Sequence, residues 1–201
     1  IISPSTGAYV NNSKQPVVFT VVDEADGSGV DLSTLVVKQD ETAVASSAIT
    51  STAIANGYQV TYTPETALTD GSHTVTVDCK DHDGNAAAQE ATTFKVDTVP
   101  PTLNITAPVA GLITASPAQT VAGTTNDATS SPVTISITLN GVDQGAVTVA
   151  SNGSFTKSVT LREGSNTIVV TATDAAGQKT TVSRTVTLDT SVPVIKSATI
   201  T

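Results

Sequence analysis

Aromatic residues and cations are scarce in this chain. Among 201 residues there is no Trp and no Met, aromatic residues make up 3%, and 9 Lys and Arg stand against 18 Asp and Glu, a formal charge of −9. Nucleic acids and anionic membrane surfaces are bound largely through Lys and Arg, so we expect neither among the partners. No apolar run approaches the roughly 20 residues that span a bilayer, so direct membrane insertion is not expected either.

Cysteine is nearly absent as well. Cys79 is the single cysteine, so no disulfide can form within the chain and core burial must hold the fold together. A reactive thiol needs a cationic neighbourhood, whereas Asp78, Asp81 and Asp83 outweigh the nearby cations. We therefore interpret Cys79 as a core residue.

The residues that are abundant favour β-strands. Thr occurs 37 times and Val 27 times, and β-branched residues are enriched in strands. At 133–139, apolar residues alternate with Thr and Ser, which is the period-2 pattern of a strand with one buried face. Similar patterns predict strands at 17–22, 35–38, 58–63, 75–79, 92–96, 155–159 and 168–172.

The chain also repeats itself. The segment Leu68-Thr69-Asp70-Gly71-Ser72-His73-Thr74 returns 93 positions later as Leu161-Arg162-Glu163-Gly164-Ser165-Asn166-Thr167. The starts of the two units are about 104 residues apart, so the first unit carries roughly eleven extra residues in its middle. We predict one domain at 1–98, a second at 99–190, and the linker and first strand of a third repeat at 191–201.

The strand count indicates the fold class. About seven short strands per unit, with turn signals such as Asn140-Gly141, are typical of an immunoglobulin-like sandwich. The prediction is therefore an all-β chain of two tandem immunoglobulin-like β-sandwiches with Greek-key topology, in an elongated arrangement. His73 and Asn166 fall at the corner where a tyrosine often bonds to the backbone, so we expect a structural role for both. Cys79 aligns with Ala172, which agrees with a core position.

Several motifs carry a resemblance to a known family. The segments Asp81-His82-Asp83-Gly84-Asn85, Val96-Asp97-Thr98-Val99-Pro100-Pro101 and Thr171-Ala172-Thr173-Asp174-Ala175-Ala176-Gly177 resemble the Ig-like tandem repeats, fibronectin III-like or cadherin-like, of bacterial cell-surface and secreted proteins. The second unit also resembles the Ig-like module found beside catalytic domains in some secreted glycan-degrading enzymes. The resemblance implies an extracellular location, but such modules serve as adhesin stalks, spacers and enzyme accessories alike.

Groups that could perform catalysis are few. His73 and His82 are the only histidines, and no Gly-x-Ser-x-Gly nucleophile motif accompanies them. The Gly-rich stretch at 26–29 lacks the Lys of a phosphate-binding loop. We therefore expect no enzymatic activity.

Acidic residues gather in two loops of the first unit. In a sandwich, the loops after the strands at 17–22 and 75–79 lie at the same end. Calcium takes six to eight oxygen ligands from flexible loops of this kind, and the clustered charges would otherwise repel one another. The candidate calcium ligands are Asp23, Asp26, Asp31, Asp81 and Asp83. The alternative is that Asp, Gly, Ser and Asn simply form the turns.

A second calcium site is predicted at the junction of the units, where cadherin-like arrays place calcium. Its candidate ligands are Asp70, Asp97, Asp127 and Asp174. The alternative is that Pro100-Pro101 stiffens the linker by fixing backbone φ, without a metal.

These observations favour a non-enzymatic segment of a larger bacterial surface or secreted protein, acting as a stalk or spacer in cell adhesion or surface display and made rigid by calcium. Its expected partners are neighbouring repeats and a cell-surface protein or glycan, and we expect a monomer. The alternative is an accessory or carbohydrate-binding module of a secreted polysaccharide-degrading enzyme. That role needs exposed aromatics, and Tyr58 and Tyr62 also fit core alternation with Val60. Protein recognition through loop tips or a sheet edge is a third possibility.

Overall fold

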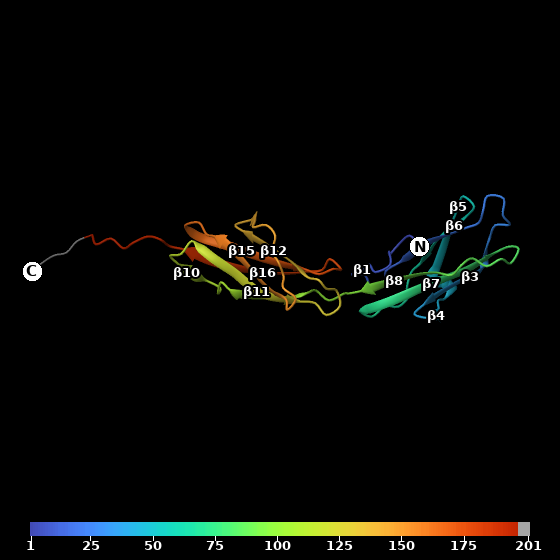
Figure 1. The fold of residues 1–201 in the computed structure, drawn as a ribbon, viewed down its shortest axis with the longest axis horizontal. Coiled ribbons are helices and arrows are strands. Elements are labelled where there is room, and N and C mark those ends of the chain that lie inside the picture. The colour runs from blue at the N-terminus through green and yellow to red at the C-terminus, as the bar shows by residue number, and fades with distance from the viewer. Residues whose placement is uncertain (197–201) are drawn as a thin grey trace, which may run out of the picture. The chain divides into compact units, whose positions relative to one another are not determined.

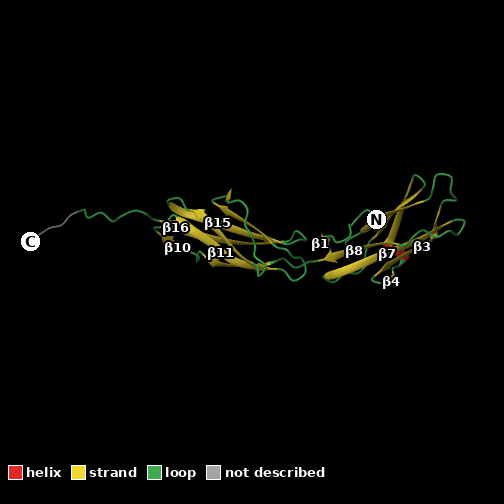
Figure 2. Cartoon of the chain, viewed as in Figure 1, coloured by secondary structure: helices red, strands yellow, loops and turns green. Residues whose placement is uncertain are grey.

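The computed structural model describes residues 1–196. Its contacts divide the chain into two compact units, and the boundary falls between Val99 and Pro100. Strands and loops make up both units, and the one helical segment of the described residues is the short 3-10 helix η1 (Ser46–Ala48) (Figure 2). None of these residues belongs to a helix with the length and hydropathy that crossing a membrane requires.

Unit one is a sandwich of two sheets (Figure 1). The five-stranded sheet has the order β1 (Tyr9–Val10), β8 (Glu90–Val96), β7 (Gly71–Asp81), β3 (Val30–Gln39), β4 (Thr42–Ala43). The three-stranded sheet has the order β2 (Val17–Val22), β6 (Gly57–Tyr62), β5 (Ile49–Ile54). Phe19 and Val60 of the smaller sheet pack in one core with Val75 and Phe94 of the larger, and each is at most 2% exposed.

Unit two repeats this architecture. Its larger sheet has the order β10 (Leu112–Thr114), β16 (Lys179–Leu188), β15 (Gly164–Thr173), β12 (Thr134–Leu139), β13 (Val142–Asp143). Its smaller sheet has the order β14 (Ser154–Thr160), β11 (Ala118–Asn126), β9 (Thr102–Ala107). The five-stranded sheets of the two units therefore have the same strand order, as expected for repeats. Ile137, Ile168 and Val170 form the centre of a separate core.

The extra residues of the first unit form β5. Between the strands β4 and β6, unit one places η1 and β5, whereas unit two joins β13 to β14 through a loop. β5 pairs with β6 along its whole length from Ile49 to Ile54 and forms the edge of its sheet. The length difference that the sequence shows is therefore one additional edge strand.

The predicted alternation of buried residues is confirmed in the equivalent strands β7 and β15. Val75, Val77 and Cys79 are buried in unit one, and Ile168, Val170 and Ala172 are buried in unit two. Cys79 is 5% exposed and is a free thiol, which agrees with its interpretation as a core residue. The third repeat predicted at 191–201 lies partly outside the described residues, and residues 191–196 form no strand.

Candidate functional sites

The corner before β7 is closed by a histidine. His73 is 7% exposed; its Nε2 lies 2.8 Å from the backbone oxygen of Thr69, and its Nδ1 lies 2.7 Å from Oδ2 of Asp40. Burial alone would lower the pKa of His73, but the hydrogen bonds to Asp40 and Thr69 and the Asp40 charge raise it above its usual value. The histidine thus holds the corner in place, as the sequence predicted.

Unit two builds the same corner from amides. Asn166 is fully buried, and its Nδ2 donates hydrogen bonds to the backbone oxygens of Arg162 and Gly164 at 2.7 and 2.9 Å. Asn140 takes the place of Asp40, with its Nδ2 3.0 Å from Oδ1 of Asn166. The backbone N–H that follows the corner residue donates to the side chain of Asp40 in one unit and of Asn140 in the other, both at 2.8 Å.

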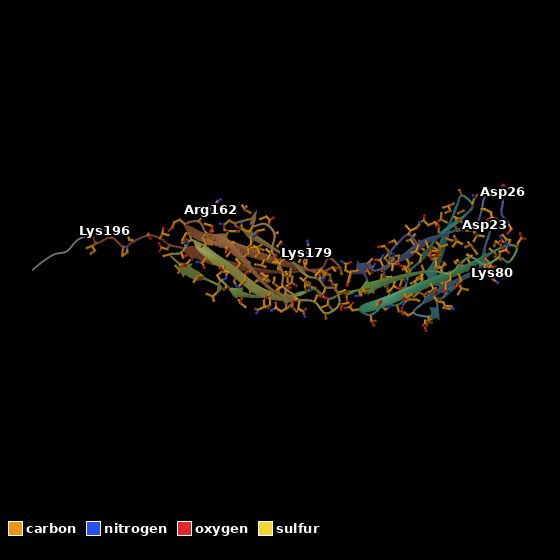
Figure 3. All side chains as sticks on the ribbon, in the orientation of Figure 1. Asp23, Asp26, Lys80, Arg162, Lys179 and Lys196 are labelled. Atoms are coloured by element: carbon orange, nitrogen blue, oxygen red, sulfur yellow. The ribbon has the colours of Figure 1, made fainter. Side chains whose placement is uncertain are left out.

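The two acidic loops of unit one lie together, as predicted. The N–H of His82 donates to the backbone oxygen of Gly29 at 3.0 Å, and the N–H of Asp83 lies 3.2 Å from Oγ of Ser28. Figure 3 shows Asp23 and Asp26 at this end of the unit, with Lys80 nearby. An open groove of about 390 Å³ lies beside the loops, with Val21, Val30 and Cys79 among its lining residues.

The carboxylates of these loops cap turns. Oδ2 of Asp23 accepts from the N–H of Gly29 at 2.7 Å. Oδ1 of Asp31 accepts from the N–H and hydroxyl of Ser33 at 2.9 and 2.6 Å, and these bonds lower the pKa of Asp31. Asp81 accepts from the side chain and the backbone N–H of Asn85, which lowers its pKa in the same way. The bonds from backbone N–H groups satisfy the backbone of tight loops.

No three of the five candidate calcium ligands in unit one bring ligand atoms within 4.8 Å of one another in the described part of the chain. Asp26 and Asp83 are exposed. Calcium binding by Asp23, Asp26, Asp31, Asp81 and Asp83 therefore stays a prediction. Turn formation is the role that the hydrogen bonds of Asp23, Asp31 and Asp81 display.

Of the junction candidates, Asp70 and Asp97 belong to unit one and order the chain where β8 ends. Oδ1 of Asp70 accepts from the N–H and the hydroxyl of Thr98, both at 2.9 Å. Asp97 is fully buried, and its Oδ1 accepts from the N–H of Val99 at 3.1 Å. A calcium-binding role for either residue stays a prediction.

The other two candidates, Asp127 and Asp174, lie together within unit two. Each has a carboxylate oxygen within 4.8 Å of one on the other residue. Asp127 follows β11, is 8% exposed, and accepts through Oδ1 from the N–H groups of Thr129 and Ser130 at 2.8 and 2.7 Å. Asp174 follows β15, is 6% exposed, and accepts through Oδ1 from the N–H of Gln178 at 2.9 Å. Its Oδ2 is buried and has no hydrogen-bond partner among the described residues.

The tyrosine pair considered for glycan binding faces the core. Tyr62 is 3% exposed, its hydroxyl bonds to Oε1 of Gln39, and burial raises its pKa. Tyr58 is half-buried and packs against the same core as Val60. This pair therefore supplies no exposed aromatic platform.

Both units are immunoglobulin-like β-sandwiches, and comparison with known proteins agrees. The family model described as bacterial Ig-like domain matches residues 8–98, so the first unit is similar to the bacterial Ig-like domains. The model described as glucodextranase, domain B matches residues 101–190. No curated protein sequence matches the chain.

Among solved structures that the chain resembles, the first below supports the fold. The fibronectin(III)-like modules of Clostridium thermocellum CbhA have a TM-score of 0.57 at 17% identity, over 92% of this chain and 91% of that one. The D00-D0 domain of Intimin has a TM-score of 0.34 at 14% identity, over 92% and 97%. Bacteroides ovatus SGBP-B, solved with a mixed-linkage heptasaccharide, has a TM-score of 0.28 at 16% identity, over 94% and 45%.

Proposed function

We propose that this chain is a non-enzymatic spacer of a larger bacterial surface or secreted protein, holding a neighbouring domain away from its anchor in adhesion or surface display. The match of the first unit to bacterial Ig-like domains supports this class. The observation that carries the proposal is that several polar side chains that could act chemically form hydrogen bonds within the fold instead.

These hydrogen bonds are formed by four of the candidates. His73 is bonded through both ring nitrogens, and the carboxylates of Asp23, Asp31 and Asp81 cap turns. The larger sheets also carry pairs of threonine hydroxyls between neighbouring strands. Oγ1 of Thr74 lies 3.0 Å from that of Thr93 in unit one, and a 3.1 Å pair occupies the matching strands of unit two. A surface of hydroxyls and negative charge favours solubility over non-specific association.

Small-angle scattering from the full chain tests the spacer proposal. At about 3.3 Å per residue, strands of about ten residues make a unit roughly 35 Å tall, so two units in line span roughly 70–80 Å. We expect a monomer with a maximum dimension at least in this range. A compact profile, with the two units side by side, would contradict the proposal.

An accessory role beside a glycan-degrading enzyme is the second candidate, because residues 101–190 match glucodextranase domain B. It predicts that the chain is retarded in native gels containing a soluble α-glucan, compared with gels without one. Because the tyrosines that the alternative relied on face the core of unit one, we expect no retardation. If the gel does retard the chain, and substitution of an exposed residue of unit two abolishes the retardation, the accessory role would be favoured.

A further inference from the structure

We propose that unit two carries a site for a divalent cation of the calcium type, formed by Asp127 and Asp174, with Oδ2 of Asp174 as a direct ligand. The two residues are 47 positions apart and lie on the loops that follow β11 and β15. The proposal goes beyond the spacer function and does not depend on it.

The first observation is the unpartnered oxygen of Asp174. The residue is 6% exposed, and its Oδ1 accepts from the N–H of Gln178. Within residues 1–196, its buried Oδ2 has no hydrogen-bond partner. Leaving a charged oxygen buried without a partner is costly. In native proteins, buried charges are paired or coordinate metal ions. Oδ2 of Asp174 is therefore a candidate ligand for a cation.

The second observation is the neighbouring carboxylate. Asp127 is 8% exposed and has an oxygen within 4.8 Å of a carboxylate oxygen of Asp174. The N–H groups of Thr129 and Ser130 hold its Oδ1 in place. Two buried carboxylates at this separation repel each other when both are charged. A cation bound between the two carboxylates attracts both of them and offsets their repulsion.

Unit one provides an internal comparison at the position 93 residues earlier. There Asp81 uses both oxygens, because Asn85 donates its N–H to Oδ1 at 2.8 Å and its Nδ2 to Oδ2 at 2.7 Å. In unit two, Gln178 stands where Asn85 stands. The turn of unit one therefore satisfies both carboxylate oxygens of Asp81. The equivalent turn of unit two leaves Oδ2 of Asp174 open to a ligand.

The donor set indicates the kind of cation. The single cysteine and both histidines of the chain belong to unit one, so the nitrogen and sulfur ligands that favour zinc are not part of this site. Two carboxylates on loops match calcium, which takes six to eight oxygens in flexible geometry from carboxylates, backbone carbonyls and water. Magnesium demands strict octahedral geometry and keeps more of its water, so we expect it to bind more weakly.

Amide NMR of the full chain, treated with a chelator and titrated with calcium chloride, locates the site. We expect saturable shifts at the amides of Thr129, Ser130 and Gln178, with one calcium bound there by calorimetry, and a weaker response to magnesium. The amides of Gly29 and Asn85 report separately on the acidic loops of unit one. Shifts confined to those loops, or no saturable shift at all, would overturn the proposal.

Substitutions test the two ligands. Calcium well above its Kd should raise the Tm of unit two by on the order of 5 °C, and Asp127→Asn and Asp174→Asn should each abolish that rise. Asp143→Asn removes the same charge from an exposed position of this unit and should retain it. Without calcium, Asp174→Asn should be at least as stable as the native chain, because repulsion is relieved. If both ligand variants keep the full calcium response, the proposal is wrong; if one fails to fold, the titration of the native chain still decides.

Discussion

Oδ2 of Asp40 lies 2.7 Å from Nδ1 of His73, so unit one closes its corner with a carboxylate–histidine pair, which is an ion pair when His73 is protonated. Unit two closes the equivalent corner with Asn140 and Asn166, which do not titrate. The same backbone geometry is therefore supported by charge in one repeat and by neutral amides in the other. This difference provides a comparison within a single chain.

The stability of unit one should depend on pH, because the pKa of His73 is raised and that of Asp40 is lowered in the folded state. A raised histidine pKa contributes stability that is fully present below the unfolded value of about 6.5 and is lost as pH rises through the folded pKa. The lowered pKa of Asp40 contributes stability that is lost as pH falls through its folded value, below 3.8. Unit one should thus lose stability as the pH rises through the folded pKa of His73 and as it falls through the folded pKa of Asp40.

Tyrosine fluorescence measures this effect selectively, because Tyr9, Tyr58 and Tyr62 are the only tyrosines and all belong to unit one. The urea midpoint should fall as pH rises from 6 to 9. The double variant Asp40→Asn/His73→Asn installs the pair of unit two and should flatten this dependence. An unchanged slope in that variant would show that other groups cause it.

Asn166→Ala should destabilise unit two strongly. Asn166 is fully buried and bonds to the backbone of Arg162 and Gly164, and each buried group left without a partner costs about 1–3 kcal/mol. Circular dichroism during urea unfolding measures the loss. Asn104→Ala, at an exposed position of β9, is the matched control and should stay within about 0.5 kcal/mol. Equal losses of stability in the two variants would mean that the hydrogen bonds of Asn166 do not stabilise the corner.

Gly153→Ala and Gly141→Ala should differ although both glycines have φ of +80°. A Cβ at Gly153 would meet the backbone oxygen of Thr125 at 2.1 Å, whereas one at Gly141 meets nothing within 4 Å. Gly141→Ala should cost about 1–2 kcal/mol from the left-handed conformation alone, and Gly153→Ala clearly more. Chemical denaturation of both variants measures this, and similar costs would show that the loop at 153 moves freely.

Phe94→Ala should cost about 3–5 kcal/mol, because this ring is fully buried at the centre of unit one. Val36→Ala removes apolar atoms from a side chain that is 40% exposed and should cost under about 1 kcal/mol. Tyrosine fluorescence follows unfolding of the unit in both variants. A small loss for Phe94→Ala would mean that the core refills the cavity.

Much of the fold could be predicted from alternation, since β2 has the predicted bounds 17–22 and both predicted inner faces are buried. β5 was not predicted, because an edge strand with nearly every residue exposed has no alternation to detect. The start of β3 was also missed: its pairing with β7 shifts register between Asp31 and Val36, which interrupts the period.

The site shows a different limit of sequence reasoning. Acidic residues close together in sequence predicted a cluster in unit one, but the loops turn those carboxylates towards their own backbone N–H groups. Asp127 and Asp174 were candidates by position alone. Their burial, and the one oxygen left without a partner, depend on how two distant loops pack, which spacing does not reveal.

The parallel pairing of β1 with β8, and of β10 with β16, has a mechanical consequence. In each unit, a strand near its beginning is bonded alongside the strand that ends it. The N–H of Asp97 donates to the oxygen of Val10, and that of Asp189 to the oxygen of Thr114, both at 2.9 Å. Tension applied to the two ends of a unit pulls these strands in opposite directions and loads their bonds together in shear. A stretched unit must break the set at once, which is harder than opening bonds one at a time.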